Sequence, residues 1–130
     1  MIDRIKQLTV VTEDKAGMLS EVVNLIAAQN VNINAIDAYG MQGKARFHII
    51  TEDNQKASSA LQAKGWEVKE EEVVAIDLEN KPGVLAGIAA KLRESDVNLL
   101  YCYGSAGGRG IFARFVMKAE DNDKAVEVLG

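Results

Sequence analysis

The sequence predicts an α+β protein made of two copies of one β-α-β-β-α-β unit, and three observations support this prediction. The segment TEDKAGML at residues 12–19 returns as LENKPGVL at residues 78–85, and EDNQKA at residues 52–57 returns as EDNDKA at residues 120–125. Within each copy, apolar residues recur first at the alternating spacing of a strand and then at the spacing of a helix. The copies have about 65 residues each, a size that is only marginally stable alone, so we expect them to pack side by side.

The first copy contains the signals for six elements. Alternating apolar residues predict strands, a stripe at helical spacing follows Gly17, and the stretch Gly40–Gly43 is typical of a hairpin. Asp53 is a candidate N-cap, and Gly65 ends the helix that it starts. The expected order is a strand at 5–12, a helix after Gly17, strands at 31–39 and 44–51, a helix after Asp53, and a strand at 66–69, after which Glu70–Glu72 form a short solvated run. This order predicts a ferredoxin-like layer, an antiparallel sheet with two helices on one face.

The second copy repeats these signals but ends early. Strands are expected through 74–78, 97–104 and 111–118, with helices after Gly83 and from about Asp121. The sequence given stops at Gly130, so the fourth strand of this copy is absent. Either the chain continues beyond that residue or a neighbouring chain covers the open edge. We therefore predict repeat 1 over residues 1–70 and repeat 2 over residues 71–130.

Composition narrows the function classes. The net charge of −4 and the isoelectric point near 5.0 argue against nucleic acid as a partner, since phosphate binding needs clustered cations. The single cysteine allows no internal disulfide, and no apolar run predicts a membrane span, so we expect a cytoplasmic protein that does not act at a membrane. No nucleophile–base pair, metal-binding spacing or cofactor fingerprint occurs, so we expect no enzyme activity, catalytic residue, metal or cofactor.

Three further features carry weaker predictions. The glycine-rich stretch 104–110 precedes no helix and is interpreted as a hairpin rather than a phosphate loop. His48 lies on the strand face opposite Phe47 and Ile49, so we predict that it is solvated or lies at an interface. The same sheet face in the second copy carries Phe112, Arg114 and Val116 and is less polar, which favours burial against another protein, in a homodimer for example.

The strand-to-helix turns are the best functional candidates. The backbone N–H groups of a first helical turn have no intrahelical partner, and the helix dipole adds positive charge there, so a carboxylate can bind. Gly17 and Gly83 leave the backbone open to a ligand. Asn32 and Asn98 open the strand after each helix and offer both a donor and an acceptor.

The order of elements, the Asn/Asp-Lys-Pro/Ala-Gly-x-Leu turn and the Val-Asn-Ile/Leu strand start resemble the ACT domain. ACT domains are small regulatory modules that bind amino acids in many metabolic enzymes. The resemblance covers nearly all 130 residues, twice, and is closest to free-standing proteins made of tandem ACT domains. It implies that a free amino acid binds between paired domains, against the turn that precedes the first helix.

The resemblance assigns two groups of ligand-binding residues. They are Asn80, Lys81, Pro82, Gly83, Val84 and Leu85, with Asn98 or its counterpart Asn32 opposite, and Asp14, Lys15, Ala16, Gly17, Met18 and Leu19. The second turn is closer to the family pattern, because it carries the typical Asn80 and Pro82-Gly83, whereas the first has Asp14 and Ala16-Gly17. Asp14 would also repel a ligand carboxylate, although it could hold an α-ammonium group. One functional site per chain and two sites both agree with this pattern, and the copies could pair within a chain or between chains.

The resulting function is that of a small-molecule sensor. Binding of an amino acid at the ACT domain interfaces would modulate a metabolic enzyme or pathway, and the enzyme itself would be a protein partner. The alternative is a regulatory or structural subunit of an enzyme complex that binds no ligand. The two functions differ in whether Asn80 and Gly83 matter beyond folding.

Overall fold

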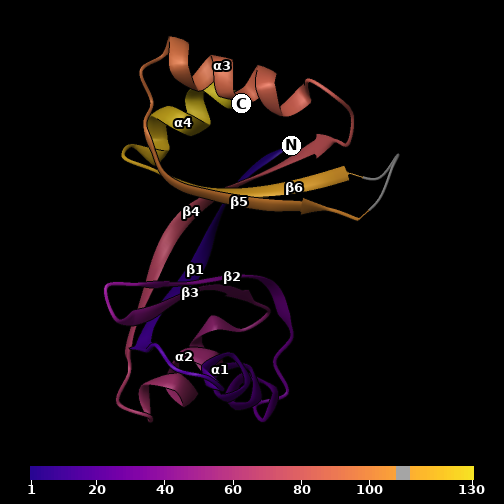
Figure 1. Cartoon of the computed structure of the whole chain (residues 1–130). Coiled ribbons are helices and arrows are strands. Elements are labelled where there is room, and N and C mark those ends of the chain that lie inside the picture. The colour runs from indigo at the N-terminus through magenta and orange to yellow at the C-terminus, as the bar shows by residue number, and fades with distance from the viewer. Residues whose placement is uncertain (108–111) are drawn as a thin grey trace. The chain divides into compact units, whose positions relative to one another are not determined.

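The computed structural model describes residues 1–107 and 112–130 (Figure 1). The chain folds into two compact units, which we call the first-repeat unit, Lys6–Glu71, and the second-repeat unit, Met1–Ile5 with Glu72–Gly130. Each unit has antiparallel strands with two helices on one face. This arrangement confirms the predicted fold class, two ferredoxin-like repeats.

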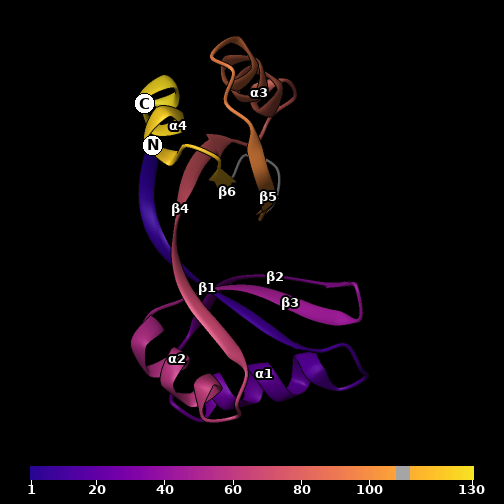
Figure 2. The same ribbon diagram turned by 90° about the vertical axis from the view of Figure 1, so that its left-hand side faces the viewer.

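The first-repeat unit follows the predicted order of elements. Its core is formed by the inward residues of the strands, such as Leu8 and Phe47, packed against the apolar stripes of the helices, such as Val22 and Leu61. In the sheet, the strands are ordered β2-β3-β1-β4, and α1 and α2 lie on one face (Figures 1 and 2). The elements are β1 (Ile2–Glu13), α1 (Met18–Ala27), β2 (Ile33–Met41), β3 (Lys44–Thr51), α2 (Asn54–Gln62) and the beginning of β4 (Glu67–Glu79).

The second-repeat unit has the same plan. Ile76, Met117 and Leu92 are buried in its core, and Phe115 packs against them from the sheet. The strands are ordered β1-β4-β6-β5, so β1 and β4 contribute to both units. The remaining elements are α3 (Val84–Glu94), β5 (Leu99–Ala106), β6 (Phe112–Ala119) and α4 (Asn122–Leu129). The predicted glycine-rich hairpin lies partly in residues 108–111, outside the described residues.

The duplication is visible in the backbone as well as in the sequence. Asn30 and Asp96 both follow the first helix of their unit with positive φ, 57° and 56°. Asp53 and Asp121 both cap the second helix, and each side chain accepts a hydrogen bond from the backbone N–H three residues later, at 3.1 and 3.0 Å. The copies therefore share helix starts and helix ends, which is why the motifs repeat at a constant spacing.

The glutamate run 70–72, expected to be a short solvated run that leads into the next strand, is itself part of a strand. It lies within the 13-residue strand β4. Thr9 donates from its hydroxyl to the Glu71 carboxylate at 2.6 Å, and Arg4 donates to Glu72 at 3.2 Å. No glycine, proline or asparagine interrupts the chain there, so nothing in the sequence turns it out of the strand.

The edge expected to remain open in the second copy is occupied by the first residues of the chain. Asp77 N–H donates to the Met1 carbonyl at 2.9 Å, and Ile2 packs against the core of the second-repeat unit. Arg4 forms ion pairs with Glu72 and Asp123. The compact units thus differ from the predicted division at residues 1–70 and 71–130, because residues 1–5 group with the second repeat.

The sheet face opposite the helices is more buried than strand alternation predicted. His48 is 1% exposed, and its Nδ1 lies 3.1 Å from the Asp37 carboxylate on the neighbouring strand. Of the two expected environments, solvated or at an interface, the solvated one was therefore wrong, and the interface stays a prediction. On the equivalent face of the second-repeat unit, Val116 is 2% exposed, whereas Phe112 is 67% exposed. Alternation identifies the two faces of a strand but not whether the second face is covered.

The helices are short. Those in the part of the chain that the structure describes have between 8 and 11 residues, and none is long and apolar enough to span a membrane.

Candidate ligand-binding site

The two strand-to-helix turns have nearly the same backbone conformation. Gly17 and Gly83 occupy the N-cap positions of α1 and α3 with φ of 91° and 87°, in the left-handed region that favours glycine. Neither helix start has a side-chain capping hydrogen bond, in contrast to α2 and α4, which are capped by aspartate. The N–H groups of Met18 and Val84 donate to the carbonyls of Lys15 and Lys81, each at 3.4 Å. The start of a helix of this kind is a suitable environment for a carboxylate.

In the first turn, the side chains are mostly exposed. Met18 is 3% exposed and anchors the helix start in the core, while Leu19 is 56% exposed. The Asp14 carboxylate lies against β2, because a Cβ atom built on Gly40 would be only 2.5 Å from its Oδ2. Lys15 Nζ lies 4.0 Å from the Glu13 carboxylate. The Asp14 side chain is therefore held close to Gly40 of β2.

The second turn differs in charge. Asn80 is half-buried and supplies an amide where the first turn has the carboxylate of Asp14. Lys81 forms an ion pair with Glu79 at 3.1 Å, and both side chains are exposed. Leu85, in the first turn of α3, is 44% exposed. A ligand carboxylate thus meets no aspartate within this turn. Of the other predicted residues in the two turns, Ala16, Pro82 and Gly83 are exposed and Val84 is half-buried.

The strand-start asparagines lie at the far ends of the helices. Helix α1 has 10 residues and is therefore about 15 Å long. It separates the first turn from Asn32, whose side chain donates to Asn34 at 2.9 Å. Asn98 likewise follows the far end of α3, and its side chain donates to Glu120 at 3.0 Å. Each turn is assembled locally, but within one unit the asparagine is not brought to the turn.

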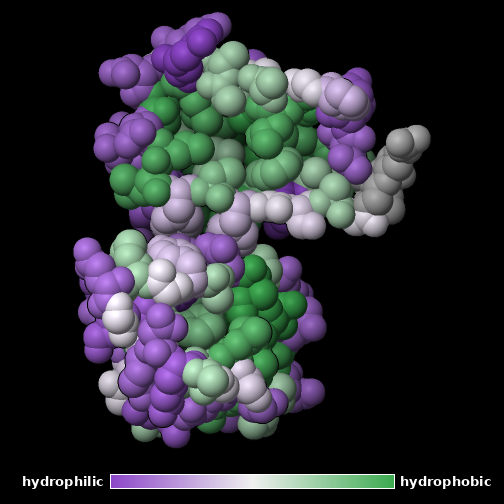
Figure 3. Space-filling model, in the orientation of Figure 1, coloured by the Kyte–Doolittle hydropathy of each residue, from purple (hydrophilic) through white to green (hydrophobic). Residues whose placement is uncertain are grey.

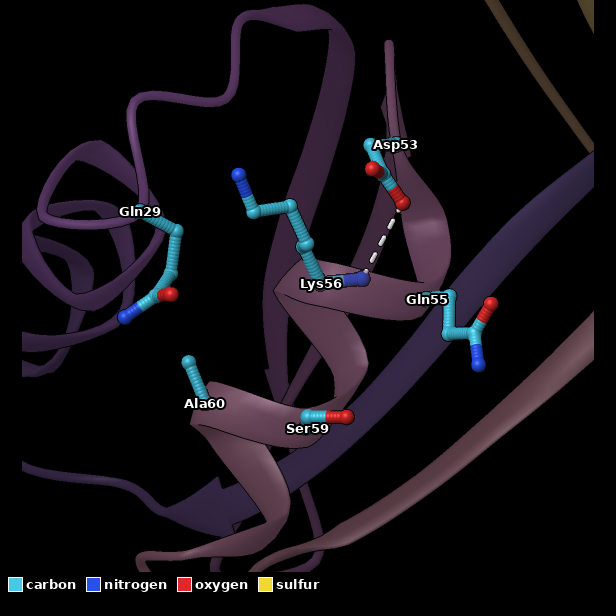
Figure 4. Close-up of a pocket in the computed structure, with 6 residues that line it drawn as sticks. All are labelled: Gln29, Asp53, Gln55, Lys56, Ser59 and Ala60. Atoms are coloured by element: carbon cyan, nitrogen blue, oxygen red, sulfur yellow. Dashed lines mark hydrogen bonds between the residues drawn. The ribbon is translucent and has the colours of Figure 1, made fainter.

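Two hollows lie outside the turns. Asn98 lines one of about 370 Å³ where the end of α3 meets the start of β5, together with Ala89, Leu92 and Leu99. The other, of about 460 Å³, lies beside α2 and was not predicted (Figure 4). It is lined by Gln29, Asp53, Gln55, Lys56, Ser59 and Ala60. No motif joins these residues in the sequence, because Gln29 follows the end of α1, whereas Asp53 is the N-cap of α2 and the others lie within α2.

The pKa shifts of two titratable groups in the described residues have simple physical causes. Partial burial raises the pKa of the Cys102 thiol, which favours its protonated form. The hydrogen bonds from Arg114 lower the pKa of Asp77, as in a structural ion pair. Among residues 1–107 and 112–130, no three His, Cys, Asp or Glu side chains are grouped so as to hold a metal ion. What the turns offer is binding of an anion by backbone groups.

This geometry defines a class of protein: a duplicated ferredoxin-like fold in which two helices begin at a glycine without a side-chain cap. A family model described as an ACT domain pair matches residues 3–129, and the chain therefore belongs to this family. The resemblance noted in the sequence is confirmed. A search of curated proteins finds no match.

Solved structures share this fold. The protein BT0572 from Bacteroides thetaiotaomicron is 30% identical, with a TM-score of 0.88 over 98% of this chain and 88% of that chain. The ligand-free regulatory subunit of aspartate kinase from Thermus thermophilus is 14% identical, with a TM-score of 0.70 over 98% of this chain and 93% of that one. The corresponding subunit from Thermus flavus is 16% identical, with a TM-score of 0.67 over 98% and 94%. At these low identities, the Thermus structures show the fold alone.

Proposed function

We propose that this chain is a regulatory protein that binds a free amino acid at an interface between ACT domains and, as a homodimer, modulates a metabolic enzyme. The observation that carries the proposal is the contrast between the helix starts. Two of them have aspartate caps, whereas α1 and α3 begin at Gly17 and Gly83 without a side-chain cap. A ligand carboxylate can accept hydrogen bonds from N–H groups of these first turns.

The chemistry of the turns fits the two charged groups of an amino acid. The first-turn N–H groups and the helix dipole stabilise the α-carboxylate. The amide oxygen of Asn80 can accept a hydrogen bond from the α-ammonium group, and Asp14 could hold that group in the first turn. Because Asp14 also repels the carboxylate, we expect the turn at Asn80–Leu85 to bind more tightly.

The rest of the site comes from a facing ACT domain. Asn32 and Asn98 lie at the far ends of α1 and α3 from the turns of their own unit. An asparagine that contacts the ligand must therefore belong to another domain. A ligand held by two domains stabilises the arrangement in which they face each other, and this differential affinity is what an enzyme partner would detect.

Thermal unfolding tests the proposal directly. The purified protein is heated with each of the twenty amino acids in turn. A ligand present at about 100 times its Kd adds about 2.7 kcal/mol, so one amino acid should raise Tm by several degrees. Asn80→Ala should remove this rise, and Asn24→Ala, which changes an exposed asparagine of α1, should retain it. Calorimetric stoichiometry then distinguishes one site per chain from two.

The rise in Tm is compared with that of the same variant without ligand, so a change in its basal stability does not matter. If no amino acid raises Tm, the proposal fails and the alternative, a ligand-free regulatory or structural subunit, takes its place. The proposal also fails if the amino acid raises the Tm of Asn80→Ala and of Asn24→Ala equally, since the ligand would then bind elsewhere.

A further inference from the structure

An arginine occupies the same sheet position in both repeats, but its surroundings differ. Arg114 on β6 lies opposite Asp77 on β4 and donates two hydrogen bonds to that carboxylate, at 2.8 and 3.3 Å. Arg46 on β3 lies opposite Val11 on β1. Val11 precedes the segment 12–19 as Asp77 precedes its repeat at 78–85, so the two positions are equivalent. The first-repeat unit therefore has the arginine but an apolar side chain in place of the carboxylate.

The guanidinium of Arg46 has no acceptor in the part of the chain that the structure describes. No hydrogen bond or ion pair joins it to residues 1–107 or 112–130. Because Arg46 is half-buried, its side chain has lost part of its hydration without gaining an acceptor in return. The carboxylates on the same sheet face have other neighbours: Asp37 lies 3.1 Å from His48, and Glu13 lies 4.0 Å from Lys15. An acceptor from another molecule would therefore complete the hydrogen bonding of Arg46.

The side chains around Arg46 suit contact with another protein. Residues that lie opposite each other in an antiparallel sheet share a face, so Tyr39, opposite Arg46, and Met41, opposite Lys44, belong to this one. Tyr39 is 39% exposed and Met41 is 50% exposed. Figure 3 shows hydrophobic and hydrophilic residues side by side over the first-repeat unit in this view. Arginine, methionine and aromatic residues are enriched in protein interfaces, whose overall composition is mixed in this way.

A protein segment fits this face better than a small anion does. We call Tyr39, Met41, Lys44 and Arg46 the Arg46 face. Its residues lie on a pair of strands, and none of them lines either of the two hollows described above. Small ligands are usually held in concave sites that enclose most of their surface, whereas a protein segment can lie along an open sheet face.

We propose that the Arg46 face binds an acidic segment of a partner protein, with a carboxylate on Arg46 arranged as the Asp77 carboxylate is on Arg114. A guanidinium and a carboxylate pair through two parallel hydrogen bonds. Lys44 adds a second positive charge two residues along the strand, and Tyr39 supplies apolar contact. The partner is the enzyme of the proposed function, and the inference rests on that function in this respect alone. Amino acid binding has no part in it.

A short acidic peptide serves as the probe in the first test. Acetylated and amidated hexaglutamate is titrated into the full chain at low ionic strength, where exposed charges interact most strongly. It should shift the NMR signal of the Arg46 Nε–H group and leave that of Arg114, which already has a carboxylate, nearly unchanged. Hexaglutamine is the uncharged control and should shift neither signal. Equal shifts at Arg46 and at Arg93, an exposed arginine of α3, would indicate non-specific attraction and overturn the proposal.

The second test gives Arg46 the internal carboxylate that Arg114 has. In Val11→Asp, the new carboxylate should pair with Arg46 and exclude that of the peptide, which should weaken binding about 10-fold. Val11→Asn has nearly the same shape without the charge and should bind the peptide as the native protein does. Any effect of a polar residue at this half-buried position on folding is common to both variants, so their difference reports the charge alone.

Three results would overturn the proposal. They are a peptide that leaves the Arg46 signal unchanged, equal peptide binding by Val11→Asp and Val11→Asn, and free glutarate that binds as tightly as the peptide. The last result would indicate a site for small anions instead of a docking face.

Amino acid binding is measured separately, by the rise in Tm. A protein that binds the peptide at Arg46 but responds to no amino acid keeps this face and loses the proposed ligand function. A protein that responds to an amino acid but fails the peptide tests does the reverse.

Discussion

Arg114 and Asp77 lie directly opposite each other on β6 and β4 and form two hydrogen bonds. The guanidinium donates from Nε to Oδ1 at 2.8 Å and from Nη2 to Oδ2 at 3.3 Å. In the first-repeat unit, Arg46 lies opposite Val11 at the equivalent positions. The arginine is thus common to both repeats, whereas its carboxylate partner is present in only one.

Asp77→Asn should destabilise the protein by about 0.5 kcal/mol at pH 7, because the ion pair is partly exposed to solvent. The hydrogen bonds from Arg114 lower the folded-state pKa of Asp77 below its ordinary value. The carboxylate therefore stabilises the fold at pH values above the ordinary pKa of about 3.9, and this contribution is lost as the pH falls through the lowered folded pKa. Urea unfolding of both proteins from pH 7 down to pH 3 checks this.

Glu127→Gln is the control, since it neutralises an exposed carboxylate of the same unit. It should show no comparable pH-dependent loss. The native protein and Asp77→Asn should become more alike in unfolding free energy as the pH falls. If their difference in unfolding free energy stayed constant or grew, the stabilising role of the Asp77 carboxylate would be contradicted.

Ile2→Ala should weaken the second-repeat unit more than the first. Ile2 is half-buried and packs against the core of residues 72–130, so we expect a loss of about 1–2 kcal/mol, less than for a fully buried isoleucine. Hydrogen exchange should accelerate in β6 and α4 more than in β3 and α2. Lys6→Ala, at an exposed position of the same strand, should change little. Faster exchange in β3 and α2 alone would show that residues 1–5 do not support the second repeat.

The part of the fold that could be predicted from the sequence is local. Gly17, Asp53 and their counterparts act on neighbouring residues, so their motifs predicted the helix starts that the structure has. Residues 1–5 could not be assigned to the second repeat because their partners, such as Asp77 and Asp123, are more than 70 residues away. Alternation along β3 showed which face His48 occupies, but the burial of that face is a tertiary property.

The candidate site also has a part that could be predicted from the sequence and a part that could not. The conformation at Gly17 and Gly83 follows from short-range backbone geometry and was visible as a motif. The pairing of each turn with Asn32 or Asn98 came from the family resemblance, and no local signal in the sequence specifies which domain faces the turn. The hollow beside α2 had no signal, since Gln29 and Lys56 meet only after α1 and α2 pack together.

Gly104→Ala should destabilise the second-repeat unit by about 1–3 kcal/mol. A Cβ atom at this position would lie 2.2 Å from Phe115 Cδ1 and 2.7 Å from the Arg114 carbonyl oxygen, so the ring and the strand would have to move. In the first-repeat unit, Ala38 lies opposite Phe47 in the same register, and Ala38→Gly is the reciprocal control. It should cost less, about 0.5–1 kcal/mol. Equal urea midpoints for Gly104→Ala and the native protein would show that the Phe115 ring moves aside freely.

Gly83→Ala separates the two roles of the second turn, folding and ligand binding. Its Cβ atom would meet no neighbour, so the change should cost about 1 kcal/mol through the left-handed backbone alone, and Gly83→Asn should cost less because asparagine tolerates that conformation. Gly17→Ala should cost the same, because its conformation and surroundings match. If a ligand carboxylate approaches the helix start at Gly83, both substitutions there should also reduce the rise in Tm caused by the amino acid, even though Gly83→Asn nearly restores basal stability. Thermal unfolding of the three variants with and without the amino acid measures both effects. A full rise in Tm in Gly83→Asn would show that the ligand does not need the open backbone at that glycine.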